Sequence, residues 1–154
     1  MTARLAWALV VASTILTVGM CLKATGWQLV YPLDDAYIHL AVARRLAESG
    51  TWGIEPGHFA SASSSPAWTV VLAALLKGLG PRAGVGLLAS GTASIALMFS
   101  AQEYLKWLGR APGWGMVALS LAAPVPLLVM LGMEHALHLA LILWLARLGS
   151  EEGG

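Results

Sequence analysis

Charged residues are scarce in this chain. They make up 11% of its 154 residues, whereas an ordinary soluble domain has about 25%. Hydrophobic residues account for 58%. So few charges cannot cover a surface that faces water, which excludes a soluble globular domain and makes lipid the solvent for much of the chain. At about 20 residues per spanning helix, this length allows four or five crossings of a bilayer.

Two further absences narrow the range of functions. The net charge is only +1, and no basic stripe is available to hold a phosphate backbone, so we expect no nucleic-acid partner. The chain has a single cysteine, Cys21. One cysteine excludes an internal disulfide and any metal site built from cysteines.

The first apolar run is long for a signal peptide. Residues 5–22 are uncharged and lie between Arg4 and Lys23. A run of about 18 residues exceeds the usual apolar region of a signal peptide, and no A-x-A-like cleavage site follows it. We interpret this run as a first transmembrane helix that is retained.

The hydropathy pattern predicts an all-α fold, a polytopic membrane helix bundle that forms a single membrane domain over residues 1–154. About four transmembrane helices are expected, at residues 5–22, 83–105, 113–132 and 134–148, of which the last is short. Residues 23–82 form a polar outer loop between the first two spans. Pro124 and Pro126 interrupt the third span, which membrane helices tolerate when neighbouring groups satisfy the freed backbone.

The outer loop is expected to contain two juxtamembrane helices. The first begins at Asp34 or Asp35, either of which can cap it, and runs to about Ser49. Its apolar stripe, which would lie on the membrane surface, consists of Ile38, Val42, Leu46 and Ser49. The second begins at Pro66, and its apolar part ends at Leu76, which is too short to cross the bilayer.

Counting crossings brings three acidic residues to one side of the membrane. The N-terminus, the turn at 106–113 and the C-terminus share one side, and the outer loop shares the other side with the turn that contains Glu134. Asp34, Asp35 and Glu134 are therefore expected to converge at one membrane surface. Paired carboxylates at such a surface suit a general base or a divalent-cation site.

Each of these acids also has a structural interpretation. Asp34 and Asp35 can simply cap the surface helix, and Glu134 can cap the last helix. An acid at the membrane boundary costs far less than one at the bilayer centre, so its presence alone requires no function. His135 and His138 are three residues apart, which differs from the H-E-x-x-H zinc signature and disfavours a metal site there.

The basic and hydroxyl residues of the outer loop have two interpretations as well. Arg44 and Arg45 can clamp a phosphate, or their side chains can snorkel towards lipid headgroups, and we favour snorkelling. The serine-rich run 61–65 is typical of a flexible linker. The alternative is contact with substrate, for which Ser64 is the candidate.

The ordered motifs of the chain resemble those of the GT-C superfamily of integral-membrane glycosyltransferases. The resemblance covers about residues 5–148 and is closest to the bacterial branch that includes arabinofuranosyl- and mannosyltransferase-like proteins. It is carried by Tyr31-Pro32-Leu33-Asp34-Asp35-Ala36-Tyr37-Ile38, Trp52-Gly53-Ile54-Glu55-Pro56-Gly57, Ser63-Ser64-Ser65-Pro66-Ala67-Trp68 and Gly132-Met133-Glu134. Such enzymes have many more membrane helices, so the chain looks like the N-terminal portion of a larger fold.

The resemblance implies transfer of a sugar from a polyprenyl-phosphate donor to a glycan or lipid acceptor, on the outer face of the plasma or inner membrane. Asp34 or Asp35 would be the base that deprotonates the acceptor hydroxyl. Glu134 would orient the acceptor or bind a cation. Arg44 and Arg45 are candidates for binding the donor phosphate. Members of the superfamily differ in their metal requirement, so the need for a divalent cation is left open.

Two other functions are compatible with the same residues. A small non-catalytic scaffold or accessory subunit would use the acids only as helix caps. A small transporter is disfavoured because the predicted spans hold no ionisable pair facing a cavity at the bilayer midplane.

Overall fold

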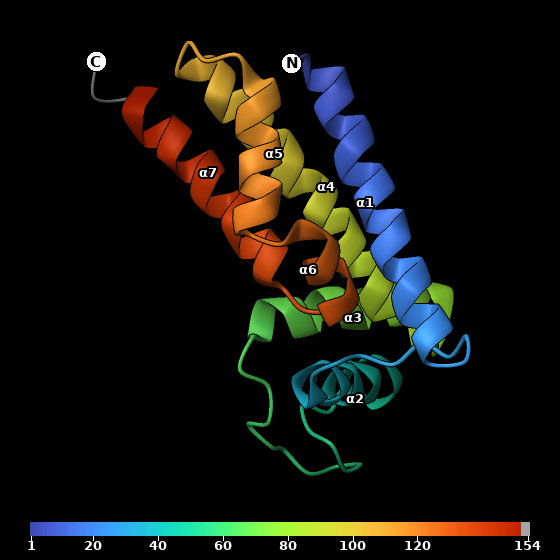
Figure 1. The fold of residues 1–154 in the computed structure, drawn as a ribbon. Helices are drawn as coiled ribbons and strands as arrows, with labels where there is room; N and C mark the ends of the chain where they lie inside the picture. Colours follow the sequence, from blue (N-terminus) through green and yellow to red (C-terminus); the bar gives the residue numbers. More distant parts are fainter. Residues whose placement is uncertain (152–154) are drawn as a thin grey trace.

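The computed structural model describes residues 1–151, which form seven helices and no strands (Figure 1). This confirms the predicted all-α fold. The helices are α1 (Ala3–Ala24), α2 (Asp34–Ser49), α3 (Pro66–Leu79), α4 (Gly84–Trp107), α5 (Pro112–Ala122), α6 (Val125–Leu131) and α7 (His135–Glu151).

Two of these helices are long and apolar enough to cross a membrane. They are α1, with 22 residues, and α4, with 24 residues. The pair α5 and α6 passes the same criterion as a third span that bends by 47° between the two helices. α7 belongs to the shorter apolar helices, so its role as a fourth crossing stays a prediction. The described chain thus has the character of a helical membrane protein.

The predicted third span consists of two helices, with the expected interruption at its prolines between Ala122 and Val125. Pro124 and Pro126 lack the backbone N–H that an uninterrupted α-helix needs, and proline rings clash with the preceding turn. The first turn of α6 is closed by the carbonyl oxygen of Pro124, which accepts hydrogen bonds from the N–H groups of Leu127 and Leu128 at 2.8 and 3.1 Å. The two prolines therefore turn α6 away from the axis of α5.

The helices divide into a bundle and a cap. In Figure 1, the N-terminus, the loop between α4 and α5 and the far end of α7 lie at one end of the bundle. The cap, which we define as α2, α3 and residues 50–65 between them, lies at the other end with the turn between α6 and α7. The outer loop and the 132–134 turn thus lie at the same end of the bundle, and the side of the membrane on which they lie stays a prediction.

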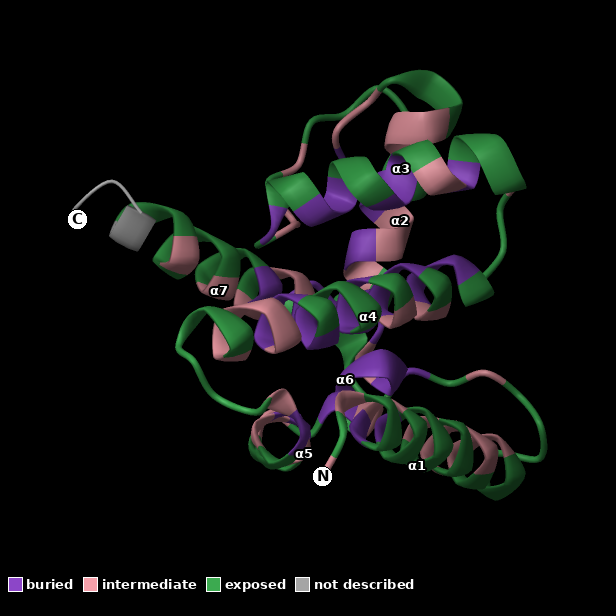
Figure 2. Cartoon of the chain, turned by 90° about the horizontal axis from the view of Figure 1, so that it is seen from above, coloured by how far each residue is buried: buried purple, intermediate pink, exposed green. Residues whose placement is uncertain are grey.

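Small side chains allow the bundle helices to approach closely. The buried core of the bundle includes Ala6 of α1, Ala93 of α4 and Ala136 of α7. α4 packs on α7, and α1 packs on α5 and α6. Small residues at helix contacts are typical of membrane bundles. Lipid tails are as apolar as the side chains, so helix association there depends on van der Waals packing. On the outside, leucines and isoleucines of α1 and α7 stay exposed (Figure 2), as lipid contact requires.

The cap is anchored to the first turns of α4. Trp68 and Leu72 of α3 are fully buried against Ala43 of α2 and Val85 and Ala89 of α4. Burying one such side chain contributes about 1.5–3 kcal/mol. The cap is therefore fixed to the bundle by its own hydrophobic cluster and does not depend on lipid for its place.

The helix predicted over 34–49 is confirmed, but its predicted apolar face is wrong. Of the four stripe residues only Val42 is buried, and Ser49 is exposed. The buried residues of α2 are Ala36, His39, Val42 and Ala43. α2 packs on α3, so the face that protein covers is turned about the helix axis from the predicted stripe and shares only Val42 with it.

Candidate functional site

The turn that carries Glu134 is held by a glycine that no other residue can replace without strain. Gly132 ends α6 with φ at +67°, in the left-handed region that favours glycine. The buried indole N–H of Trp68 donates to the carbonyl oxygen of Gly132 at 3.3 Å. The cap thereby fixes the backbone from which Glu134 projects two residues later.

Tyr31 holds the same turn from its other side. Its hydroxyl donates to the carbonyl oxygen of Ala83 and accepts the N–H of Leu87 at 2.9 Å, at the start of α4. Its ring lies so close to Gly132 and Gly86 that a Cβ at either position would overlap it. Burial raises the pKa of the Tyr31 phenol, so the group stays a neutral hydrogen-bond donor.

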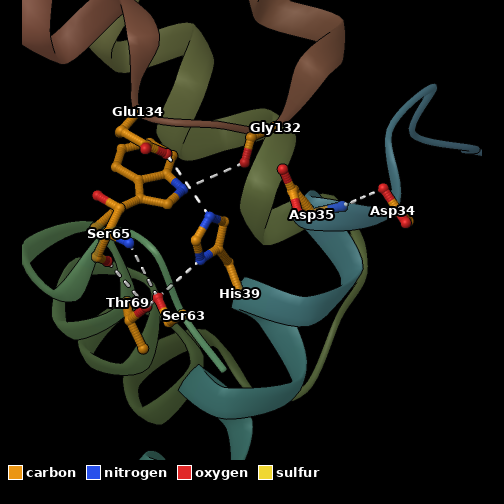
Figure 3. Close-up of polar contacts among 9 residues, drawn as sticks. Asp34, Asp35, His39, Ser63, Ser65, Thr69, Gly132 and Glu134 are labelled. Atoms are coloured by element: carbon orange, nitrogen blue, oxygen red, sulfur yellow. Dashed lines mark hydrogen bonds and ion pairs between the residues drawn. The ribbon is translucent and has the colours of Figure 1, made fainter. Parts of the chain in front are cut away.

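Glu134 points towards His39 of α2 (Figure 3). Both residues are buried, with exposed fractions of 7% and 1%. Glu134 Oε2 lies 4.0 Å from His39 Nε2, an ion-pair distance but longer than a hydrogen bond. The backbone carbonyl of Glu134 accepts the N–H of His138, whereas its carboxylate makes no capping hydrogen bond within residues 1–151. The interpretation of Glu134 as a side-chain cap is therefore wrong.

A chain of hydroxyl groups supports the other side of the His39 ring. His39 Nδ1 lies 2.9 Å from Ser63 Oγ, and Ser63 Oγ lies 2.6 Å from Thr69 Oγ1 (Figure 3). Thr69 Oγ1 also donates to the carbonyl oxygen of Ser65 at 3.1 Å. The end of the serine-rich run thus packs between α2 and α3, and Ser63 contacts the buried imidazole.

Asp34 and Asp35 occupy the exposed first turn of α2, at the same end of the molecule as Glu134 (Figure 3). Leu33 stands at the cap position and no side chain caps the helix; Asp34 Oδ1 instead accepts the N–H of Asp35 at 3.1 Å. Asp35 precedes His39 by one helical turn, so the two share a face of α2. Negative charge in this turn also suits the helix dipole.

Arg44 and Arg45 line a groove of about 510 Å³, together with Arg82 from the segment that enters α4. Arg44 Nε lies 2.7 Å from Glu48, and this hydrogen bond lowers the pKa of the Glu48 carboxyl. Arg45 contacts Glu48 at 3.5 Å and donates to the carbonyl oxygen of Ile54 at 3.1 Å. Arg82 has no ion pair within the described chain. The groove thus has three arginines, and Glu48 is the carboxylate paired with two of them, so the groove carries an excess of positive charge.

The role of Ser64 as a substrate contact stays a prediction, and one further polar residue was not foreseen. Ser64 is exposed, and its hydroxyl makes no hydrogen bond within residues 1–151; its neighbours Ser63 and Ser65 form the network instead. His39 was missed altogether. Its one available signal was the spacing of four residues from Asp35, which places it on the same helical face.

No group of three or more histidine, cysteine or acidic side chains within residues 1–151 is arranged to hold a metal ion. His135 and His138 are both exposed on α7.

Comparison of the chain with known protein families, with curated proteins and with solved structures finds no match.

Proposed function

We propose that the chain is a membrane glycosyltransferase, or the N-terminal module of one, that transfers a sugar from a polyprenyl-phosphate donor to a glycan or lipid acceptor. It would act as a multi-pass protein on the outer face of the plasma or inner membrane. One observation carries the proposal: Asp34, Asp35 and Glu134 come from segments about 100 residues apart in sequence, yet they lie at the same end of the bundle (Figure 3).

The exposed aspartates suit the role of base. Asp34 or Asp35 would take the proton of the acceptor hydroxyl while the hydroxyl oxygen attacks the anomeric carbon. The bond between that carbon and the phosphate oxygen breaks, and the electron pair leaves with the polyprenyl phosphate. Both carboxylates reach solvent at the start of α2, so an acceptor can approach them without displacing the cap.

The basic groove suits the leaving phosphate. Negative charge accumulates on the phosphate oxygens as the glycosidic bond breaks, and a cation close to these oxygens stabilises that charge. Arg44 and Arg82 line one groove beside apolar residues such as Leu76 and Pro81. A lipid phosphate has the same combination of charge and apolar chain. Glu134, whose carboxylate faces His39 at 4.0 Å, would orient the acceptor.

The direct test measures sugar transfer by the complete protein in its native membrane. The variants are Asp34→Asn, Asp35→Asn and the double variant, with Glu55→Gln as a matched control because Glu55 is an exposed acid of the same cap. Loss of a general base lowers turnover by about 10²–10⁴-fold. We expect such a loss in the double variant and normal transfer in the control. Wild-type transfer in the double variant would leave the aspartates with a purely structural role, as in a scaffold.

A second arm tests the groove. Arg82→Gln is expected to raise the KM for the polyprenyl-phosphate donor while the KM for the acceptor stays unchanged. Arg110→Gln is the matched control, since Arg110 is an exposed arginine at the opposite end of the bundle. Equal donor KM values for the two variants would remove the groove from the donor site.

A further inference from the structure

An apolar groove runs between α1 and α4, the two helices that are long enough to span a membrane. α1 packs on α5 and α6, and α4 packs on α5, α6 and α7, but α1 and α4 make few direct contacts with each other. Figure 2 shows α6 between them. The walls come from α1 between Trp7 and Ile15 and from α4 between Leu87 and Met98, two valines of α6 form the floor, and the volume is about 330 Å³. We call this space the α1–α4 groove.

The α1–α4 groove offers an occupant neither a charge nor a free hydrogen-bonding group. No charged residue among residues 1–151 lines it. The hydroxyls of Thr14 and Thr92 each donate to a carbonyl oxygen of their own helix at 2.8 Å, and the indole N–H of Trp7 donates to Gln102 at 2.9 Å. The hydroxyl of Ser94 makes no hydrogen bond within residues 1–151, but it is buried. The groove therefore suits an occupant that is hydrocarbon over its whole length.

The groove is too narrow for a helix. Along α4 it extends from Leu87 to Met98, which is about 17 Å at 1.5 Å per residue. A volume of 330 Å³ over that length gives a mean cross-section of about 20 Å². A helix about 10 Å in diameter has a cross-section of about 80 Å². A single hydrocarbon chain is far thinner than a helix and fits this space.

The length and the position of the groove match one leaflet of a bilayer. A hydrocarbon core of about 30 Å gives each leaflet about 15 Å. Leu87 lies in the first turn of α4, at the cap end of the bundle, and Met98 lies just beyond the middle of this helix. Further along, the hydrogen bond between Trp7 and Gln102 joins the two walls. The groove thus runs from the cap end towards the midplane, as an acyl chain of the cap-side leaflet does.

A cation lies at the cap end of the same pair of helices. Lys23 is exposed in the last turn of α1 and has no ion pair within residues 1–151. A lysine at the membrane surface attracts an anionic lipid headgroup. Arg82, which precedes α4, lines the basic groove of the cap that we assign to the donor phosphate. Lys23 is a cation that this donor groove does not use.

We propose that the α1–α4 groove binds one acyl chain of an anionic phospholipid from the cap-side leaflet, with the lipid phosphate beside Lys23. Only Ala6 and Val10 of the 22 residues of α1 are buried by protein. The lipid fills the space that α1 and α4 leave between them and thereby supports the position of α1. A polyprenyl chain is much longer than one leaflet, so a groove of this length does not suit the donor. The site does not depend on the proposed transfer reaction.

Binding is measured by native mass spectrometry of the complete protein in detergent, titrated with dioleoylphosphatidylglycerol. We expect one lipid to bind with saturation, and zwitterionic dioleoylphosphatidylcholine to bind more weakly. Binding without saturation would indicate annular lipid only and would overturn the proposal. Displacement of the phospholipid by an equal concentration of polyprenyl phosphate would also overturn it, because the groove would then take the donor. A lipid-free dimer that Ile95→Trp abolishes would overturn it in favour of a second copy.

A matched pair of variants tests the place of the acyl chain. Ile95 lines the groove and is 62% exposed, whereas Ile142 of α7 is 60% exposed and lies outside the groove. Ile95→Trp adds bulk inside the groove, so we expect it to lose saturable binding of phosphatidylglycerol. Ile142→Trp is expected to bind like the wild type. Equal affinities of the two variants would remove the lipid from the α1–α4 groove.

A second pair tests the contact with the phosphate and leaves the groove unchanged. Lys23→Gln is expected to weaken binding of phosphatidylglycerol about 5-fold, the effect of one lysine near an anionic headgroup, and to leave binding of phosphatidylcholine unchanged. Lys77→Gln is the control, since Lys77 is an exposed lysine in the last turn of α3. Both lysines are exposed, so these variants remain informative even if Ile95→Trp does not fold. Equal affinities of the two lysine variants for phosphatidylglycerol would overturn the proposed headgroup contact.

Discussion

Replacing Gly132 with alanine introduces a methyl group at the most crowded point of the turn that precedes Glu134. The added Cβ would lie 2.4 and 2.7 Å from two ring carbons of Tyr31. The ring cannot move away freely, because its hydroxyl is bound to Ala83 and Leu87 at the start of α4. The backbone of Gly132 also has a φ of +67°, which disfavours any residue with a Cβ.

The cost has two parts that a second glycine separates. A left-handed conformation costs an alanine about 1–2 kcal/mol, and forcing a methyl into packed surroundings costs about 1–3 kcal/mol. Gly132→Ala should therefore lower the free energy of unfolding by about 2–5 kcal/mol. Gly50 ends α2 with φ at +70° and has no atom within 4 Å of its added Cβ. Gly50→Ala should show the backbone cost alone.

The assay is unfolding of both variants in the same detergent micelles, followed by far-UV circular dichroism. Gly132→Ala is expected to be the less stable of the two by about 1–3 kcal/mol, the packing part of the cost. In the double variant Tyr31→Ala/Gly132→Ala this difference should shrink, because the overlapping ring is gone. Equal stabilities of the two single variants would refute the claim that Tyr31 clamps the turn.

Two further predictions concern the interior of the bundle and the clamp. Ser90→Ala removes a buried hydroxyl that donates to the carbonyl oxygen of Val129 at 2.7 Å, so unfolding in micelles should show a free energy of unfolding lower by about 1 kcal/mol. Thr92→Val is the control, because the Thr92 hydroxyl bonds only within α4. A loss for Ser90→Ala no larger than that of the control would contradict this prediction. Burial raises the folded pKa of Tyr31 above the ordinary tyrosine value of 10.0, so the folded state holds this proton more tightly than the unfolded state. Its contribution to stability is thus fully present below pH 10 and is lost as the pH rises through the folded pKa. Above pH 10 the wild type should lose stability more steeply with pH than Tyr31→Phe, and parallel pH profiles would contradict the shift.

Charge and proline positions allow the helix boundaries to be predicted closely. The span expected at 83–105 is α4 at Gly84–Trp107, and the helix expected to begin at Pro66 does so. Proline, glycine and charged residues gather at the ends of the apolar runs, so the printed sequence contains this information. Pro124 was visible too, but the sequence did not reveal that two prolines two residues apart would bend the span by 47°.

The rotation of a helix about its axis was harder to predict. The apolar stripe of α2 pointed to Ile38 and Leu46, whereas the buried face includes His39 and Ala43. Buried polar residues usually lie beside polar partners, and the neighbours of the His39 ring are Ser63 and Glu134. Such pairings depend on tertiary contacts between distant segments, which a hydropathy pattern does not contain. The common end of the bundle for the three acids was predictable, because it follows from the expected number of crossings.

The central claim is that the start of α2 and the turn before α7 meet on one face of the membrane. Sidedness is measured with a membrane-impermeant maleimide on intact and on opened cells, in a Cys21→Ser background that removes the one native cysteine. The exposed positions tested are Asp35→Cys, His135→Cys and, in the loop between α4 and α5, Ala111→Cys. We predict that the first two react in intact cells and that Ala111→Cys reacts only after the cells are opened. Reaction of Asp35→Cys and His135→Cys from opposite sides would contradict the account.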